Sequence, residues 1–364
     1  MAKIKVLVVD DSALMRQLLT RILTHGGDIE VVGAAADPLI AWKKIQELRP
    51  DVLTLDVEMP KMDGLTFLSK LMAARPMPVV MVSSLTARGA ETTLKALELG
   101  AFDFVTKPSI DVTNGTAQIS EDIITKVRAA ATSRIRRRAA GPALAGPPLT
   151  IQAPKGLAEA TDKVIAIGAS TGGTEALARV LPALPGDSPG TVVVQHMPKA
   201  FTSAFAQRLN GLCRMRVKEA ENGDRIIRGT VLVAPGDFHM EVVRQGAAYY
   251  VKLNQQPQVN GFRPSVDVLF HSCANQLGPH ATSAILTGMG RDGAAGMLAM
   301  RSVGSYTVAQ DEESCVVFGM PKEAIAAGGA VRVVPLDRIA GELIAAVTGA
   351  RSGDLRETAS GSRR

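Results

Sequence analysis

The feature that most constrains this chain is a series of short apolar runs that end abruptly in polar residues and alternate with helical patterns. The first series predicts strands at 4–9, 30–34, 52–55, 79–83 and 103–106. A second series predicts strands at 163–167, 191–195, 230–234, 283–287 and 305–309. Because strands that alternate with helices form doubly wound parallel sheets, we expect two α/β domains of this kind.

The length of the chain also indicates two domains, since 364 residues exceed one ordinary hydrophobic core. We place the first domain at 3–128 and the second at 161–349. Between them, 129–160 is expected to hold a helix end and a flexible linker, because it is rich in Pro, Gly and Ala. The polar tail at 350–364 is expected to be disordered.

Five polar positions in the first series lie at or just after the ends of predicted strands. They are Asp10, Asp11, Asp56, Ser83 and Lys107. Because parallel strands end at one edge of a sheet, these side chains are expected to converge there. A cluster of carboxylates suits Mg²⁺ better than zinc, and a lysine beside it suits an incoming phosphoryl group.

The second series begins with a glycine-rich turn, Gly168-Ala169-Ser170-Thr171-Gly172-Gly173, between a strand and a helix. This is the setting of a nucleophile elbow, in which a serine hydroxyl stands above the sheet edge. The N–H groups of the helix start could also bind an oxyanion. Taken alone, the turn equally fits a phosphate-binding loop or a plain tight turn.

A nucleophilic serine needs a base and an orienting acid. His196 follows a predicted strand on the same sheet edge, and His239 lies in a turn that could also reach a cleft, so both are candidate bases. His271 and His280 fall on a predicted helix and its end, as expected of surface or core residues. Asp292, in a glycine-rich turn after another strand, is the candidate acid, although a simple turn also explains it.

Charge and cysteine usage exclude several classes. The formal net charge is +6, and no acid occurs from residue 123 to 158, where seven Lys and Arg residues lie. No aromatic residue is interleaved with them, so we favour a solvated helix end and linker over nucleic-acid binding. The three scattered cysteines fit reduced thiols in the cytoplasm, and no run is long enough for membrane insertion. Acids directly after the first apolar run argue against a signal peptide.

The first domain resembles the receiver domain of two-component response regulators, which has a flavodoxin-like fold. The motifs that carry the resemblance are Val8-Val9-Asp10-Asp11-Ser12, Asp56, Met59-Pro60, Met62-Asp63-Gly64, Ser83 and Lys107-Pro108. The resemblance implies that Asp56 accepts a phosphoryl group from a histidine kinase of the CheA type. It also implies that Mg²⁺ is held by Asp10, Asp11, Asp56 and the backbone carbonyl of Glu58.

The same resemblance implies a switch. Lys107 pairs with the phosphoryl oxygens, Ser83 hydrogen-bonds them, and Phe104 changes rotamer as the readout.

The second domain resembles the effector domain of the CheB family of chemotaxis protein-glutamate methylesterases, a Rossmann-like fold. The motifs that carry the resemblance are GASTGGTEAL, QHMP, VAPGDFHM, RPSVDVLF and TGMGRDGAAGM. It implies Ser170 as nucleophile, His196 as base and Asp292 as orienting acid, with the oxyanion bound by the backbone N–H groups of Thr171 and Met289. The implied substrates are glutamate methyl esters of chemoreceptors, with deamidation of certain receptor glutamines, and the hydrolysis needs no cofactor.

Two alternative outputs remain open from the residues. One is a DNA-binding domain, which would require a helix-turn-helix or basic helix that the strand pattern does not predict. The other is an adaptor with an inactive domain, against which the complete Ser, His and Asp set argues. If the chain is a hydrolase, a tethered receiver can inhibit it by covering the site until Asp56 is phosphorylated.

Overall fold

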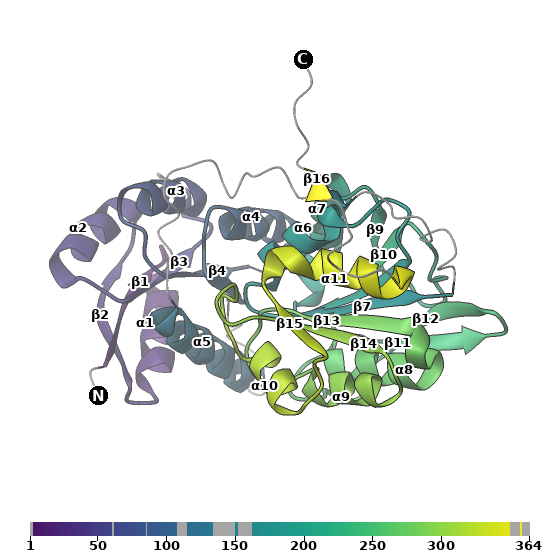
Figure 1. The fold of residues 1–364 in the computed structure, drawn as a ribbon. Helices are drawn as coiled ribbons and strands as arrows, with labels where there is room; N and C mark the ends of the chain where they lie inside the picture. Colours follow the sequence, from purple (N-terminus) through teal and green to yellow (C-terminus); the bar gives the residue numbers. More distant parts are fainter. Residues whose placement is uncertain are drawn as a thin grey trace, which may run out of the picture. The chain divides into compact units, whose positions relative to one another are not determined.

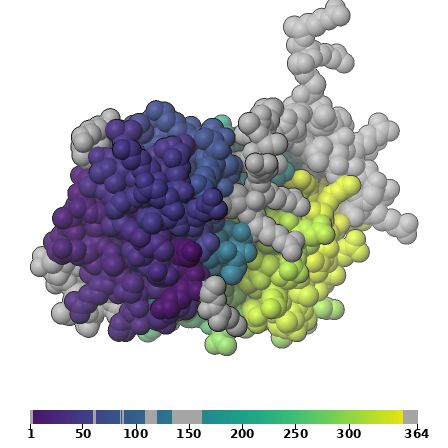
Figure 2. All heavy atoms as spheres, turned by 90° about the vertical axis from the view of Figure 1, so that its left-hand side faces the viewer, coloured from purple at the N-terminus to yellow at the C-terminus, as the bar shows by residue number. Residues whose placement is uncertain are grey.

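The computed structural model describes residues 3–59, 62–84, 86–107, 115–133, 150–151, 162–349 and 357–358. The chain forms two compact units, Met1–Ala143 and Leu144–Arg364. In Figure 2 the purple and blue atoms belong to the first unit and the green and yellow atoms to the second. Most of the predicted linker and tail lies outside the described residues. Within them, β6 (Thr150–Ile151) pairs antiparallel with β16 (Glu357–Thr358).

The first unit contains a five-stranded parallel sheet in the order β2-β1-β3-β4-β5. Its strands are β1 (Ile4–Val9), β2 (Ile29–Ala35), β3 (Val52–Asp56), β4 (Val79–Ser83) and β5 (Asp103–Thr106). All five predicted strands are confirmed to within a residue or two. The reversal of order between β1 and β3 brings the ends of these two strands together at one edge, where Asp10 and Asp56 lie.

Five helices cover the two faces of this sheet. They are α1 (Ala13–Thr24), α2 (Pro38–Leu48), α3 (Gly64–Ala74), α4 (Ala87–Glu98) and α5 (Gly115–Thr132). Figure 1 shows α1 and α5 on one face and the other three on the opposite face. The first four each begin at a capping residue whose side chain accepts an N–H of the first turn, namely Ser12, Asp37, Asp63 and Thr86.

The second unit contains a seven-stranded parallel sheet in the order β15-β14-β13-β7-β8-β10-β9. Its strands are β7 (Val164–Ala169), β8 (Gly190–Gln195), β9 (Arg216–Glu219), β10 (Thr230–Val233), β13 (Ala281–Ile285), β14 (Tyr306–Gln310) and β15 (Arg332–Val334). The chain runs from β7 to β8 on one side and returns to β13 on the other. The carboxyl ends of β7 and β13 therefore flank the topological switch point, where a crevice opens in sheets of this kind.

Helices lie on both faces of the second sheet (Figure 1). On one face are α6 (Gly173–Ala183), α7 (Lys199–Leu212) and α11 (Leu336–Thr348). On the other are α8 (Val266–Leu277), α9 (Ala294–Ser302) and α10 (Met320–Ala326), and the short 3-10 helix η2 (Gly278–His280) follows α8. Among the helices of the described segments, none is both long and apolar enough to cross a membrane.

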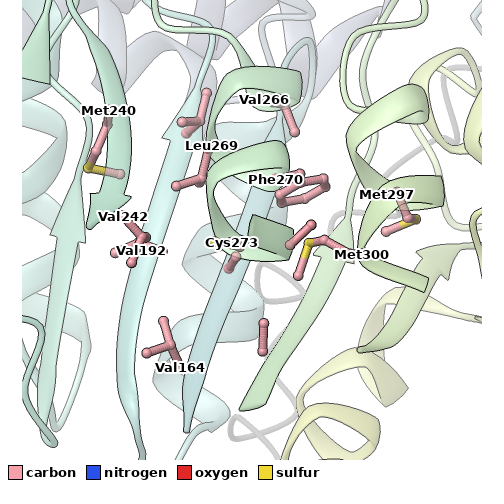
Figure 3. Packing of buried hydrophobic residues seen from close by; sticks show 14 of the residues in the cluster. Val164, Val192, Met240, Val242, Val266, Leu269, Phe270, Cys273, Met297 and Met300 are labelled. Atoms are coloured by element: carbon pink, nitrogen blue, oxygen red, sulfur yellow. The ribbon is translucent and has the colours of Figure 1, made fainter. Parts of the chain in front are cut away.

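An antiparallel hairpin, not predicted from the sequence, is formed by β11 (His239–Gln245) and β12 (Ala248–Asn254). This hairpin extends the core beyond the parallel sheet. Figure 3 shows Met240 and Val242 of β11 beside the apolar face of α8, which carries Leu269 and Phe270 toward the sheet. The Ser272 hydroxyl of α8 accepts the Val242 N–H at 2.9 Å, so the hairpin and the helix that it covers are joined by a polar contact as well.

Candidate active site

The carboxylates of Asp10, Asp11 and Asp56 lie together at the end of the first sheet. One oxygen from each lies within 4.8 Å of the others, so the three could share one cation. The Oδ2 atoms of Asp10 and Asp56 are buried. Buried carboxylates are costly unless a positive charge compensates them. This donor set therefore fits a hard divalent cation such as Mg²⁺.

Lys107 supplies part of that positive charge. Its Nζ lies 2.8 Å from Asp56 Oδ2 and 3.4 Å from Asp10 Oδ2. Burial nevertheless raises the pKa of Asp56 to about 6, against the effect of Lys107. Burial alone would lower the pKa of Lys107, but Asp56 and Asp10 raise it above its usual range. A single lysine thus leaves the cluster short of neutralising charge.

The two expected switch residues lie on neighbouring strands and have different contacts. Ser83 is buried at the end of β4, and its hydroxyl is 2.7 Å from that of Thr93 on α4. Phe104 is buried in β5, with Lys126 Nζ 5.4 Å from the centre of its ring. Ser83 Oγ accepts the Thr93 hydroxyl and donates to the Ser84 and Gly89 carbonyls at 3.3 and 3.4 Å, so its proton must leave these carbonyls before it can bond a phosphoryl group on Asp56.

Ser170 lies in the turn between β7 and α6. Its N–H donates to the Thr287 carbonyl at 3.1 Å, and its own carbonyl accepts Gln195 Nε2 at 2.9 Å. Gly172 follows in a left-handed conformation (φ +76°), which glycine adopts without strain, and α6 begins directly after it. The turn is thus bonded to the ends of both neighbouring strands, β8 and β13.

His196 and Asp292 meet at this edge. His196 Nε2 lies 2.8 Å from Asp292 Oδ2, and both side chains are almost completely buried. His196 Nδ1 is also buried and has no partner in the described structure, so the bond to Ser170 Oγ is not formed here. Since the Nε2–H group donates to Asp292, Nδ1 is the nitrogen left to accept a proton. Bonds of this kind often form only in the complex with substrate.

Asp292 is held at the N-terminus of α8. It accepts the Ser265 hydroxyl at 2.7 Å, the Val266 N–H at 2.6 Å and the Asn260 amide at 2.9 Å. Burial alone would raise the pKa of Asp292, but the bonds from His196, Asn260 and Ser265 lower it to about 2. The carboxylate therefore stays ionised beside the imidazole across the whole neutral range.

The two expected oxyanion donors lie on adjacent turns. The Thr171 carbonyl accepts the Thr287 hydroxyl at 3.0 Å, which joins the turn after β7 to the turn after β13. Met289 follows Gly288, where a Cβ would lie 2.8 Å from Ser170 Cβ. The Gly288 carbonyl accepts the N–H groups of Gly319 and Met320, so the backbone before Met289 is fixed close to the serine.

His239, the alternative base, is occupied elsewhere. It is the first residue of β11 rather than part of a turn, and it is 1% exposed. Its Nε2 lies 3.0 Å from the Pro257 carbonyl, and its Nδ1 accepts the Ser265 N–H at 3.3 Å. Both ring nitrogens form hydrogen bonds with backbone groups, so His239 anchors the segment that precedes α8. His271 lies on α8 and His280 ends η2, as predicted.

Two residues near the triad escaped the sequence analysis. Phe262 stacks on His196 with ring centres 3.7 Å apart and planes 8° from parallel. Asn260 donates to both Asp292 and Asp267. Neither belongs to an obvious chemical motif, and only the Asn260-Gly261 pair, typical of a tight turn, marks the segment in the sequence.

Comparison with known proteins shows which families this sequence is similar to. Residues 165–343 match the family model described as CheB methylesterase, and residues 6–118 match the response regulator receiver domain. The protein-glutamate methylesterase/protein-glutamine glutaminase of Salmonella typhimurium (strain LT2) is 56% identical over 348 residues, 96% of this chain and 98% of that protein. One from Geobacter metallireducens is 58% identical over 92% of this chain and 93% of that protein. The solved CheB methylesterase catalytic domain of Thermotoga maritima is 41% identical and covers 50% of this chain and 97% of that one, with a TM-score of 0.49.

Proposed function

This chain belongs to the CheB family of receiver-linked methylesterases, and from that premise we propose that Ser170, His196 and Asp292 carry its hydrolytic reaction. The chain is a protein-glutamate methylesterase and protein-glutamine glutaminase whose activity is regulated through a receiver domain. One observation carries the assignment of the residues. The His196–Asp292 bond leaves one buried imidazole nitrogen without a partner, on the edge where Ser170 lies.

The proposed reaction proceeds through an acyl-enzyme. Ser170 Oγ attacks the ester carbonyl while His196 Nδ1 takes its proton, and the imidazolium is stabilised by Asp292. The N–H groups of Thr171 and Met289 bind the oxyanion. His196 returns the proton to the departing methoxide, and methanol leaves. Water then repeats the sequence, releasing glutamate and restoring the serine. With a glutamine substrate, ammonia leaves in place of methanol.

The receiver is proposed to gate this reaction through Asp56. A divalent cation bound by Asp10, Asp11, Asp56 and the Glu58 carbonyl would offset the negative charge that repels an anionic phosphodonor. Lys107 would then pair with the phosphoryl oxygens, and the Ser83 hydroxyl would donate to them in place of the Ser84 and Gly89 carbonyls. The phosphodonor is expected to be a histidine kinase and the substrate a methylated chemoreceptor helix.

The direct test is methanol release from methylated receptor membranes, with and without a phosphodonor. Ser170→Ala should abolish release, because the loss expected for a triad nucleophile is several orders of magnitude. Ser283→Ala is a matched control, since this buried serine of β13 makes no side-chain hydrogen bond in the described structure. If the wild type released no methanol under either condition, the chain would be an inactive adaptor.

A further inference from the structure

A tight turn, Val259–Phe262, lies against the triad. The N–H and carbonyl groups of Val259 and Phe262 exchange hydrogen bonds of 3.1 and 2.9 Å. The two residues between them, Asn260 (φ +53°) and Gly261 (φ +83°), are both left-handed. Asn-Gly is the pair that such a turn favours. The turn therefore fixes Asn260 and Phe262 relative to each other.

Asn260 bridges two buried carboxylates. Its Nδ2 lies 2.9 Å from Asp292 Oδ1 and 2.8 Å from Asp267 Oδ2, so each carboxylate receives one N–H. Asp267 has a raised pKa, first because it is buried and in part because Asp292 is near. A neutral group that donates to both reduces their repulsion. Because the Asn260 amide donates to Asp292 Oδ1, Asp292 Oδ2 stays directed at His196.

Phe262 packs against His196, the proposed base. Its ring lies nearly parallel to the imidazole at stacking distance, so it covers one face of His196. Rotation of the imidazole about its Cβ–Cγ bond would drive the ring into this face. The stack thus fixes the plane of the imidazole, and the bond from Nε2 to Asp292 leaves Nδ1 for the serine.

The turn is anchored on both sides. His239 holds the Pro257 carbonyl before it, and Arg263 after it bonds to Asp237. Arg263 also donates to the carbonyls of Gln255 and Gln256 at 3.1 and 3.0 Å. The segment 255–264 is therefore closed on itself and tied to the start of β11.

We propose that segment 255–264 is a positioning element of the triad, in which Asn260 orients Asp292 and Phe262 orients His196. The inference rests on the proposed function of the triad. Neither residue is assigned a chemical step, because each acts on the substrate only through the side chain that it holds.

The test for Phe262 compares two variants of the full-length protein under phosphodonor, with kcat and KM measured separately. Phe262→Leu keeps an apolar side chain but loses the stack, and should lower kcat about tenfold with KM within twofold, since an aromatic pair is worth about one tenfold factor. Phe262→Tyr keeps the ring and should stay within twofold of wild type. A rise in KM with unchanged kcat would mean that Phe262 contacts substrate, and would overturn the proposal.

The test for Asn260 compares a variant without the amide with a variant that carries a negative charge in its place. Asn260→Ala removes the two bonds and should lower kcat about tenfold. Asn260→Asp is similar in size but places a third carboxylate against Asp292 and Asp267, so it should lower kcat further. Asn222→Ala is the control, because it removes a bond to the Leu253 N–H elsewhere on the hairpin. Equal kcat values for Asn260→Ala and Asn260→Asp would contradict the bridging role.

The triad assignment and the positioning role can be refuted independently of each other. If Ser170→Ala stays active, the proposed function is wrong whatever the turn does. If Ser170→Ala is inactive while Phe262→Leu and Asn260→Ala both match wild type, only the positioning role is refuted. Thermal unfolding of each variant shows whether it is folded.

Discussion

The close approach of Gly288 to the serine predicts a large effect from one methyl group. A Cβ at position 288 would lie 2.8 Å from Ser170 Cβ and 2.3 Å from Met320 Sδ. The thioether is flexible and can move away, but Ser170 is fixed by its bonds to Thr287 and Gln195. Carbon atoms in contact lie about 3.5–4.0 Å apart, so the two turns must separate by roughly 1 Å.

A displacement of that size matters because Met289, whose N–H is an expected oxyanion donor, follows Gly288 directly. A misplacement of about 1 Å at an active site can reduce the rate about a hundredfold, or about 2.7 kcal/mol of transition-state stabilisation. Loss of one oxyanion donor has an effect of similar or larger size. We therefore expect Gly288→Ala to lower kcat for methanol release about a hundredfold.

The assay is methanol release from methylated receptor membranes under phosphodonor, alongside thermal unfolding. Gly341→Ala is the matched control, because a Cβ at this position in α11 meets nothing within 4 Å. It should leave the rate unchanged. A folded Gly288→Ala enzyme with a rate within threefold of wild type would refute the argument that these two turns must stay in contact.

Further predictions concern single residues. Asp56→Asn should abolish phosphorylation by acetyl phosphate in Mg²⁺ while basal hydrolysis persists, and stoichiometric phosphate on this variant would identify another acceptor. Chelation of the cation should likewise stop phosphorylation but not basal hydrolysis. His239→Ala should lower the unfolding free energy by about 1–3 kcal/mol through its lost backbone contacts, yet reduce kcat far less than His196→Ala; the reverse order of kcat would make His239 the base. The pKa of Asp292 is lowered from 3.8 to about 2, so roughly 2 kcal/mol of stability should be present above pH 4 and lost as the pH falls toward 2. A stability difference between wild type and Asp292→Asn that does not change between pH 5 and pH 2.5 would contradict this.

The sequence predicted those parts of the fold whose local pattern agrees with their environment. The strands that became β1, β3 and β7 are largely apolar because parallel strands are buried on both faces. Their polar ends met at the expected sheet edges, and so Asp10 lies near Asp56 and Ser170 near His196.

The elements and residues that were not predicted depend on tertiary contacts or have weaker local patterns. Apolar and polar residues alternate only in part within β11 and β12, on either side of Gly246, so the local sequence indicates this hairpin weakly. The short strands β9 and β15 are partly polar and become strands only beside longer neighbours. Asn260 and Phe262 acquire their contacts from a loop that is brought to the triad by its anchors, which no local pattern specifies.

The central claim is that Ser170 is a nucleophile activated by His196. The most direct measurement is mass spectrometry of the phosphodonor-treated protein after reaction with a fluorophosphonate, which forms a covalent bond only with an activated hydroxyl. We predict one adduct, on the peptide that contains Ser170, and its loss in His196→Ala. An adduct on a different serine, or equally fast labelling of Ser170 without His196, would contradict the account.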